Sequence, residues 1–190
     1  MIEKLSAIFM NKHKAYRVCI IGNSGSGKST LAKVLGRQLD VPVFHLDREL
    51  LHGQFVAYTK KEQLIRHAAL IAQENWIIDG DYKSFLSQRL ERATAVIFLD
   101  VSRFITVPRL IARFFKDSLL TKSVPADARN RASVFVLKRT IGYNRQKKLQ
   151  YLRELCLDHP HAQLIILKPG TIGSWLENIL LKLKKANPVD

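Results

Sequence analysis

The chain has 190 residues, of which 47% are hydrophobic and 25% are charged. These proportions are typical of soluble globular proteins and exclude disordered or collagen-like chains. The length predicts a single domain that covers residues 1–190. Lysine and arginine total 31 against 16 aspartate and glutamate residues, which gives a formal net charge of +15. Such a surface attracts anions, among them nucleotides, nucleic acids and acidic lipids, without choosing among them.

Neither export nor a membrane span is indicated by the sequence. Residues 1–14 are short and mixed, and they lack the long apolar core and cleavage site of a signal peptide. The strongest apolar runs are of strand length, far below the ~20 residues that cross a bilayer. Cys19 and Cys156 lie in apolar contexts without the spacing of zinc or redox motifs, which favours buried, reduced thiols. We therefore expect a cytoplasmic protein.

Apolar segments of strand length alternate with longer helical patterns along the chain. The five predicted strands are residues 17–21, 43–46, 76–78, 95–99 and 164–167. Their alternation with helices predicts an α/β fold in which helices cover both faces of a parallel sheet. Two capping boxes predict helix starts: Thr59-Lys-Lys-Glu62 opens a helix that ends near Asn75, and Ser174-Trp-Leu-Glu177 opens the last helix.

The first predicted strand leads directly into Gly22-Asn-Ser-Gly-Ser-Gly27-Lys28-Ser29, a full match to the Walker A pattern of a phosphate-binding loop (P-loop). Its glycines let backbone N–H groups surround a phosphate at the N-terminus of the next helix. Lys28 reaches the β- and γ-phosphates, and Ser29 offers a hydroxyl to Mg²⁺. The predicted nucleotide-binding residues are Gly22, Asn23, Ser24, Gly25, Ser26, Gly27, Lys28, Ser29 and Thr30. We expect ATP and Mg²⁺ at this site.

A P-loop alone does not separate kinases from GTPases, ATPase motors or regulatory switches, because one phosphate cradle serves them all. The chain lacks the Asp-x-x-Gly and Asn-Lys-x-Asp motifs of GTPases. Motors usually carry paired acids at the end of a strand, whereas Trp76-Ile-Ile-Asp79-Gly80 ends in one carboxylate. A compact kinase fits these residues better.

Two aspartates follow predicted strands and are candidates for the chemistry. Asp79 is expected at the carboxyl edge of the sheet, where it would hold Mg²⁺ through water; a turn or capping role is the alternative. Asp47 is the candidate base for the attacking hydroxyl of an acceptor, and the alternative is an N-cap of the following helix. His45 and His52 flank this position, and we expect them to be structural or exposed.

Several segments together resemble the adenylate-kinase-like proteins called DNA-topology modulation (FlaR-type) proteins. The matching segments are Gly22–Thr30, His45–Asp47, Trp76–Tyr82, Arg89–Ala93 and Ile97–Asp100. The resemblance implies a P-loop fold of the nucleoside-monophosphate-kinase type, with a five-stranded parallel sheet of order 2-3-1-4-5 and a small lid. It also implies that Arg109 lies near the base and phosphates of the donor and that Arg113 clamps phosphates. A solvated basic helix face is the alternative for both arginines.

The predicted lid is residues 116–140, a basic segment interrupted by proline and poor in strand pattern. Arg139 and Arg145, at or near its end, are weaker candidates for closing over the triphosphate. The loop 168–171 follows the last strand, where this fold passes the adenine ring, and we expect backbone contacts from it. No repeat or flexible linker indicates a second domain.

The acceptor side departs from the relatives. Asp81 stands where Asn is usual in the FlaR-type pattern, Ser102 stands where Pro is usual, and Lys83 replaces the arginine with which adenylate kinases grip the acceptor phosphate. We expect a phosphotransferase that moves the γ-phosphoryl group of ATP to a nucleotide, a nucleoside or another small acceptor. The alternative is a regulatory P-loop ATPase that binds nucleic acid non-specifically through its basic surface, although no helix-turn-helix, zinc finger or stacking platform is recognisable.

Overall fold

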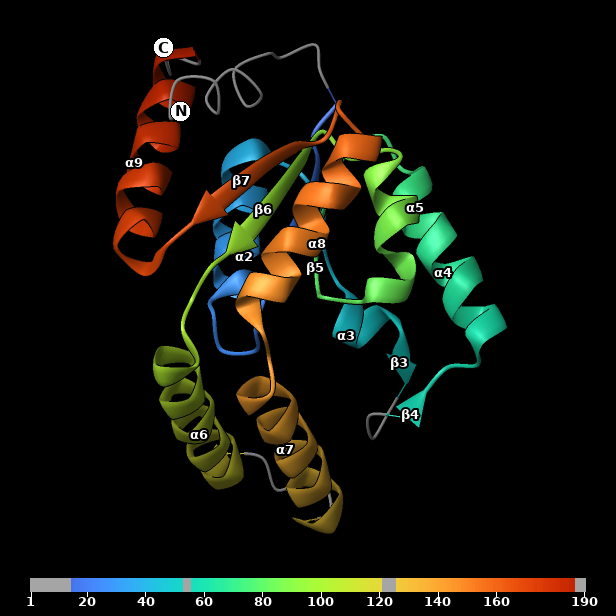
Figure 1. Ribbon diagram of the computed structural model, residues 1–190, viewed down its shortest axis with the longest axis vertical. Helices are drawn as coiled ribbons and strands as arrows, with labels where there is room; N and C mark the ends of the chain where they lie inside the picture. The colour runs from blue at the N-terminus through green and yellow to red at the C-terminus, as the bar shows by residue number, and fades with distance from the viewer. Residues whose placement is uncertain (1–14, 53–55, 121–125, 187–190) are drawn as a thin grey trace.

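The computed structural model describes residues 15–52, 56–120 and 126–186, and its centre is a five-stranded parallel sheet (Figure 1). The strands are β1 (Arg17–Gly22), β2 (Val43–His45), β5 (Trp76–Asp79), β6 (Ala95–Leu99) and β7 (Gln163–Leu167). They lie in the order β2-β5-β1-β6-β7, and every neighbouring pair is parallel. Numbered within this sheet alone, that order is 2-3-1-4-5, so the predicted fold and strand order are confirmed.

Helices cover both faces of the sheet. On one face, α2 (Lys28–Leu39) and α9 (Pro169–Ala186) pack against the strands. The opposite face is covered by α3 (Leu46–Glu49), α4 (Lys60–Ala72), α5 (Leu86–Leu90) and α8 (Arg145–Asp158). A short antiparallel ladder of β3 (Leu51–His52) and β4 (Val56–Ala57) and the 3-10 helix η2 (Lys83–Phe85) complete this second layer.

The central strand β1 shows why the sheet needs both layers. Val18 and Ile20 belong to one core cluster, whereas Cys19 and Ile21 belong to the other, and all four are fully buried. A parallel strand that is covered on both faces is read as a continuous apolar run. Cys19 and Cys156 are both free thiols, as predicted; Cys156, on α8, is only half-buried. Burial raises the pKa of each thiol to about 11, so both are poor nucleophiles.

The two predicted capping boxes had different outcomes. At α4 the Thr59 hydroxyl accepts from the Glu62 N–H at 3.3 Å, and the Glu62 carboxylate accepts from the Thr59 N–H at 2.8 Å. The prediction for the last helix was wrong, because α9 begins at Pro169 and Ser174 lies inside it. Proline is favoured at the first helical position, where its missing N–H costs nothing. The predicted loop 168–171 is therefore mostly the first turn of α9.

Beyond the carboxyl end of the sheet, α6 (Arg103–Leu120) and α7 (Ala126–Ile141) lie side by side (Figure 1). The predicted lid segment, residues 116–140, falls on the end of α6 and most of α7, and its residues 121–125 lie outside the described residues. That the segment closes over a ligand stays a prediction. None of the helices in the described ranges combines the length and apolar character that a membrane span requires.

Candidate nucleotide site

The P-loop connects β1 to α2 at the carboxyl edge of the sheet. Gly25 and Gly27 have φ angles of 78° and 95°, in the left-handed region that favours glycine. At Gly25 a side chain is also excluded by packing, because a Cβ atom would lie 2.7 Å from the carbonyl oxygen of Thr106 on α6. Both the backbone conformation and the contact with α6 therefore require glycine at position 25.

Lys28 lies half-buried over the P-loop, and its Nζ donates to the carbonyl of Asn23 at 2.8 Å. Burial lowers the pKa of Lys28, and the carboxylates of Asp79, Asp47 and Asp81 act in the opposite direction. Asp79 ends β5, Asp81 follows it, and Asp47 follows β2, so all three carboxylates lie at the carboxyl edge of the sheet where the P-loop follows β1. Ser29 and Thr30 follow on the first turn of α2 and are exposed.

Asp79 is the last residue of β5, the strand next to β1, and its carboxylate is only 5% exposed. Its Oδ2 lies 2.6 Å from Nδ1 of His45, which ends β2 and pairs with Asp79 in the strand register. The sequence prediction had treated His45 only as structural or exposed. The structure instead places its imidazole where it orients the Asp79 carboxylate, an arrangement typical of the partners that surround metal ligands.

The donor atoms at this edge fit Mg²⁺. The ion favours oxygen ligands, and in nucleotide sites it takes one or two from the protein and the rest from phosphates and water. Ser29 offers an exposed hydroxyl, and Asp79 offers a carboxylate already oriented by a neighbour. Within the described ranges no three or more His, Cys, Asp or Glu side chains cluster as a metal site. The metal roles of Ser29 and Asp79 stay predictions.

Asp47 follows the second strand of the sheet as predicted, and it is the second residue of α3. It lies inside α3, whose N-cap is His45, so the alternative that Asp47 caps this helix is wrong. The carboxylate is exposed, and its Oδ1 accepts from the hydroxyl of Tyr82 at 3.0 Å. Burial and then the charge of Asp47 raise the pKa of Tyr82, so the phenol keeps its proton and acts as the donor.

A buried arginine holds the turn that carries these groups. Arg89, on α5, is fully buried and donates to the carbonyls of Gly80 at 3.0 Å and Tyr82 at 3.1 Å. Gly80 has a φ angle of 136°, and a Cβ atom there would lie 2.9 Å from Cβ of Leu46. Arg89 belongs to the segment Arg89–Ala93 that resembles the FlaR-type family, and the sequence alone indicates no role for it. The structure shows that it fixes residues 79–82.

The predicted arginines of the lid region divide into two groups. Arg139 donates to the carbonyl of Asp81 at 3.1 Å, and Arg145 pairs with Asp100 at 3.1 Å. Arg109 and Arg113 are exposed on α6, where no hydrogen bond or ion pair joins either one to another described residue. Their roles at the phosphates therefore stay predictions.

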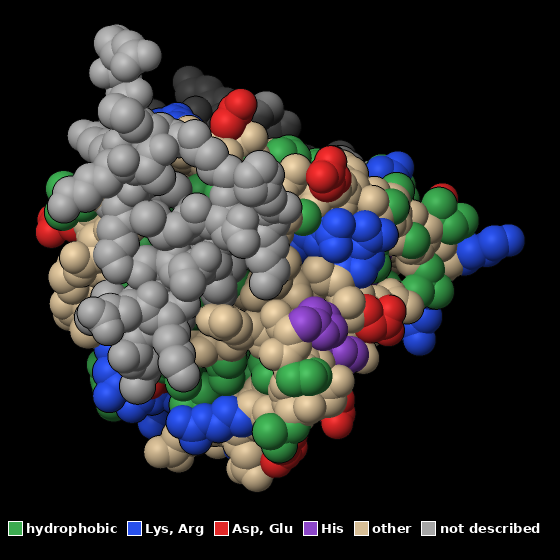
Figure 2. Space-filling view, turned by 90° about the horizontal axis from the view of Figure 1, so that it is seen from above, with side chains coloured by type: hydrophobic (Ala, Val, Ile, Leu, Met, Phe, Trp, Pro, Cys, Tyr) green, Lys and Arg blue, Asp and Glu red, His purple; other side chains and the backbone are tan. Residues whose placement is uncertain are grey.

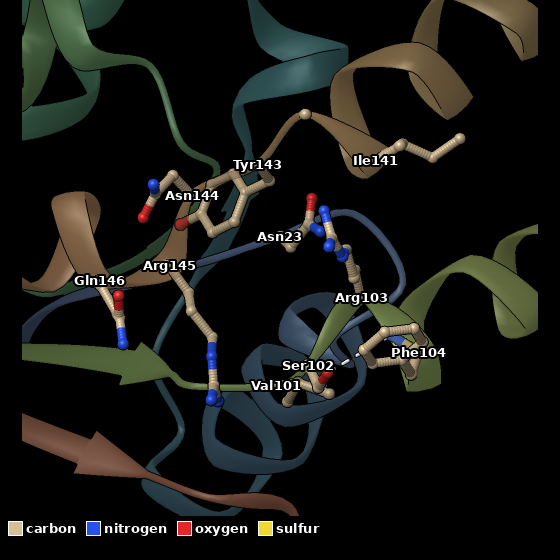
Figure 3. Close-up of a pocket in the computed structure, with 11 residues that line it drawn as sticks. Asn23, Val101, Ser102, Arg103, Phe104, Ile141, Tyr143, Asn144, Arg145 and Gln146 are labelled. Carbon is tan, nitrogen blue, oxygen red and sulfur yellow. Dashed lines mark hydrogen bonds between the residues drawn. The ribbon is translucent and has the colours of Figure 1, made fainter.

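One side chain ties the P-loop to both helices of the predicted lid. The Nδ2 of Asn23 donates to the carbonyl of Thr140 on α7 at 3.0 Å and to the hydroxyl of Thr106 on α6 at 3.3 Å. All three residues are buried. Beside Asn23 lies a cavity of about 390 Å³ between the starts of α6 and α8, and Figure 3 shows Arg103 and Tyr143 lining it.

Comparison with known proteins gives the fold. No protein-family model and no curated protein matches the chain. A provisionally named kinase from Chloroflexus aurantiacus superposes with a TM-score of 0.53 at 12% identity, over 92% of this chain and 99% of that one. Shikimate kinase from Acinetobacter baumannii, solved with shikimate, gives 0.50 at 14% identity, over 97% and 99%. The chain therefore shares the α/β fold of these two kinases.

Proposed function

We propose that this chain is a Mg²⁺-dependent phosphotransferase that moves the γ-phosphoryl group of ATP to a small acceptor. The observation that carries the proposal is the convergence of Lys28 in the P-loop with Asp79 and Asp47 from neighbouring segments. A P-loop alone serves many classes of NTPase. An exposed carboxylate at the same edge of the sheet as the P-loop lysine, beside a carboxylate suited to the ion, is what a kinase additionally needs.

Each residue has a distinct role in the proposed reaction. The N–H groups of residues 22–30 bind the β-phosphate, and Lys28 moves from the Asn23 carbonyl to the β- and γ-phosphates. Mg²⁺, held by Ser29 and through water by Asp79, would neutralise charge on the phosphates. Asp47 takes the proton of the attacking hydroxyl. Arg109 would lie near the donor base and phosphates, and Arg113 would clamp phosphates.

The finer assignments belong to the same proposal. We place the chain near the FlaR-type proteins on the segments quoted above, with residues 116–140 as a lid over the donor. Closure of α6 and α7 would exclude water from the phosphoryl group, as lids do in related enzymes. A cytoplasmic location also stays a prediction.

A regulatory ATPase that binds nucleic acid is less well supported. Figure 2 shows the end of the molecule opposite α6 and α7, and on the described part of this one face the lysine and arginine side chains form separate groups rather than one band. Non-specific binding to a polyanion usually depends on such a continuous basic surface. The net charge of +15 remains compatible with weak, salt-sensitive binding.

The test is ATP consumption by the full chain with Mg²⁺ at about 150 mM salt, where surface electrostatics are screened. Nucleosides, nucleotides, sugars and duplex DNA are added in separate reactions. We expect a small compound to stimulate turnover with formation of its phosphorylated product, and we expect DNA to leave turnover unchanged or lower. Strong stimulation by DNA with no active small compound would replace the kinase by the regulatory ATPase.

A further inference from the structure

The charges around the proposed acceptor position are mostly negative. Three carboxylates and one guanidinium act on Lys28: those of Asp79, Asp47, Asp81 and Arg139. Lys28 itself serves the triphosphate in a P-loop. Arg139 is therefore the one other cation among the groups whose charge acts on Lys28.

The guanidinium of Arg139 already makes a hydrogen bond, and the ammonium groups of the nearby lysines contact other side chains. Arg139 donates to the carbonyl of Asp81, whose carboxylate pairs with the ammonium group of Lys148. Lys83, which replaces the phosphate-gripping arginine of adenylate kinases, lies 4.7 Å from the ring centroid of Tyr151 on α8. Its charge is thus directed to an aromatic face rather than toward Asp47.

A phosphorylated acceptor fits this edge poorly. A phosphate monoester carries about 1.5 to 2 negative charges at neutral pH and is usually gripped by paired, charge-assisted hydrogen bonds from arginine. Here it would approach the exposed carboxylate of Asp47. Like charges at short range repel, so a phosphate monoester beside Asp47 is disfavoured.

A neutral hydroxyl group fits the same edge well. The hydroxyl of Tyr82 donates to Oδ1 of Asp47, and Oδ2 has no hydrogen-bond partner among the described residues. Oδ2 can therefore accept from an alcohol while Tyr82 fixes the plane of the carboxylate. Arg89, through the carbonyls of Gly80 and Tyr82, holds the turn that positions Tyr82.

We infer that the acceptor is an uncharged hydroxyl compound, such as a sugar, a polyol or a nucleoside, and that Tyr82 positions Asp47 to receive its proton. This inference rests on the proposed phosphotransferase. The acceptor oxygen forms a bond to Pγ while the bond from Pγ to the β,γ-bridging oxygen breaks. ADP leaves with that electron pair, and the hydroxyl proton goes to Asp47. No further reactant is needed.

Matched pairs of compounds test the inference on the full chain with ATP and Mg²⁺. Each neutral alcohol is compared with its own monophosphate: adenosine with AMP, thymidine with TMP, ribose with ribose 5-phosphate and glycerol with glycerol 3-phosphate, extended to other sugars and nucleosides. We expect an active neutral member whose kcat/KM exceeds that of its monophosphate about tenfold or more, since repulsion from Asp47 is lost. Preference for the monophosphate, or no active neutral member, overturns the inference.

Two variants test the role of Tyr82. Tyr82→Phe should lower kcat with the neutral acceptor by about tenfold while the KM for ATP changes by less than about twofold, because only Asp47 loses a partner. Tyr151→Phe is the matched control, since it removes the same group from α8, and it should behave as wild type. Equal losses in both variants, or a Tyr82→Phe loss confined to ATP affinity or folding stability, would overturn the positioning role.

Measurement of ATP binding separates the two levels of the proposal. If the folded wild-type chain fails to bind ATP with Mg²⁺, the phosphotransferase itself is wrong, and the acceptor class falls with it. If the chain binds ATP and phosphorylates AMP or TMP in preference to the nucleoside, the phosphotransferase stands and only the acceptor inference is overturned.

Discussion

The P-loop and the proposed acceptor site, called the acceptor edge below, lie next to each other, but their residues are arranged differently along the sequence. The P-loop is built from consecutive residues, Gly22 to Ser29, and its binding groups are mainly backbone N–H groups. The acceptor edge is assembled from Asp47 on α3, Asp79 at the end of β5, Tyr82 in the following turn and Arg89 on α5. A site made of consecutive residues can be predicted from the sequence, whereas a site that strand register and helix packing bring together cannot.

The largest effect should come from the P-loop. Lys28→Ala should lower ATP turnover by about 1,000-fold, because it removes the mobile cation at the β- and γ-phosphates, and should leave the fold intact. Lys33→Ala is the control, since Lys33 is exposed on the same helix. Turnover and thermal unfolding are measured together. Undiminished ATP binding and turnover in a folded Lys28→Ala protein would contradict the P-loop assignment.

The fold and the P-loop were predicted because each depends on local pattern. Fully buried parallel strands such as Ala95–Leu99 are continuous apolar runs, and the P-loop fixes the position of the first strand. The start of α9 was missed because Ser174-Trp-Leu-Glu177 imitates a capping box, whereas Pro169 begins the helix. The alternative that Asp47 is an N-cap was also wrong, since the chain turns into α3 directly after His45.

The partners at the acceptor edge could not be found in the same way. His45 meets Asp79 because β2 and β5 are neighbours in register, although the residues are far apart in sequence. Tyr82 reaches Asp47 through a turn that is fixed by a buried arginine. The sequence offered one indication of these partners. A polar residue lies at the end of each of two predicted strands, and the sheet order 2-3-1-4-5 makes those strands neighbours.

The acceptor edge, unlike the P-loop, should depend for its stability on the buried side chain of Arg89. Arg89→Met should lower the free energy of unfolding by about 2 to 3 kcal/mol, because the Gly80 carbonyl loses the donor that Arg89 supplies and the Tyr82 carbonyl keeps only the N–H of Phe85. Denaturant unfolding measures the loss. Arg92→Met is the control, from a half-buried arginine in the turn after α5. Equal stability of the Arg89 variant and wild type would show that the turn holds itself.

A smaller effect is expected at Asp79, in the proposed Mg²⁺ site. His45→Ala should raise the Mg²⁺ concentration needed for half-maximal turnover by about tenfold, because Asp79 loses its orienting partner. His45→Asn is the matched variant, since its amide nitrogen can take the position of Nδ1 and should restore most of the effect. A titration of turnover against Mg²⁺ checks both. Identical Mg²⁺ dependence in all three proteins would leave His45 a structural role only.

The smallest expected effect concerns Asn23, the P-loop residue that contacts both helices of the predicted lid. Asn23→Ala removes the donor to the Thr140 carbonyl and the Thr106 hydroxyl. The Thr140 carbonyl then keeps only the longer bond from the Tyr143 N–H, at 3.4 Å, and the loss of a hydrogen bond costs about 1 kcal/mol. The cost falls on the contact between α7 and the P-loop, since the sheet keeps its own hydrogen bonds. Amide hydrogen exchange in residues 134–141 should therefore accelerate by about fivefold while exchange in β6 stays unchanged.

Thr106→Val, the control variant, removes only the longer of the two bonds, at 3.3 Å, and should have a smaller effect. If exchange rises equally in β6, Asn23 stabilises the whole domain, and the P-loop and the predicted lid are not coupled through this side chain.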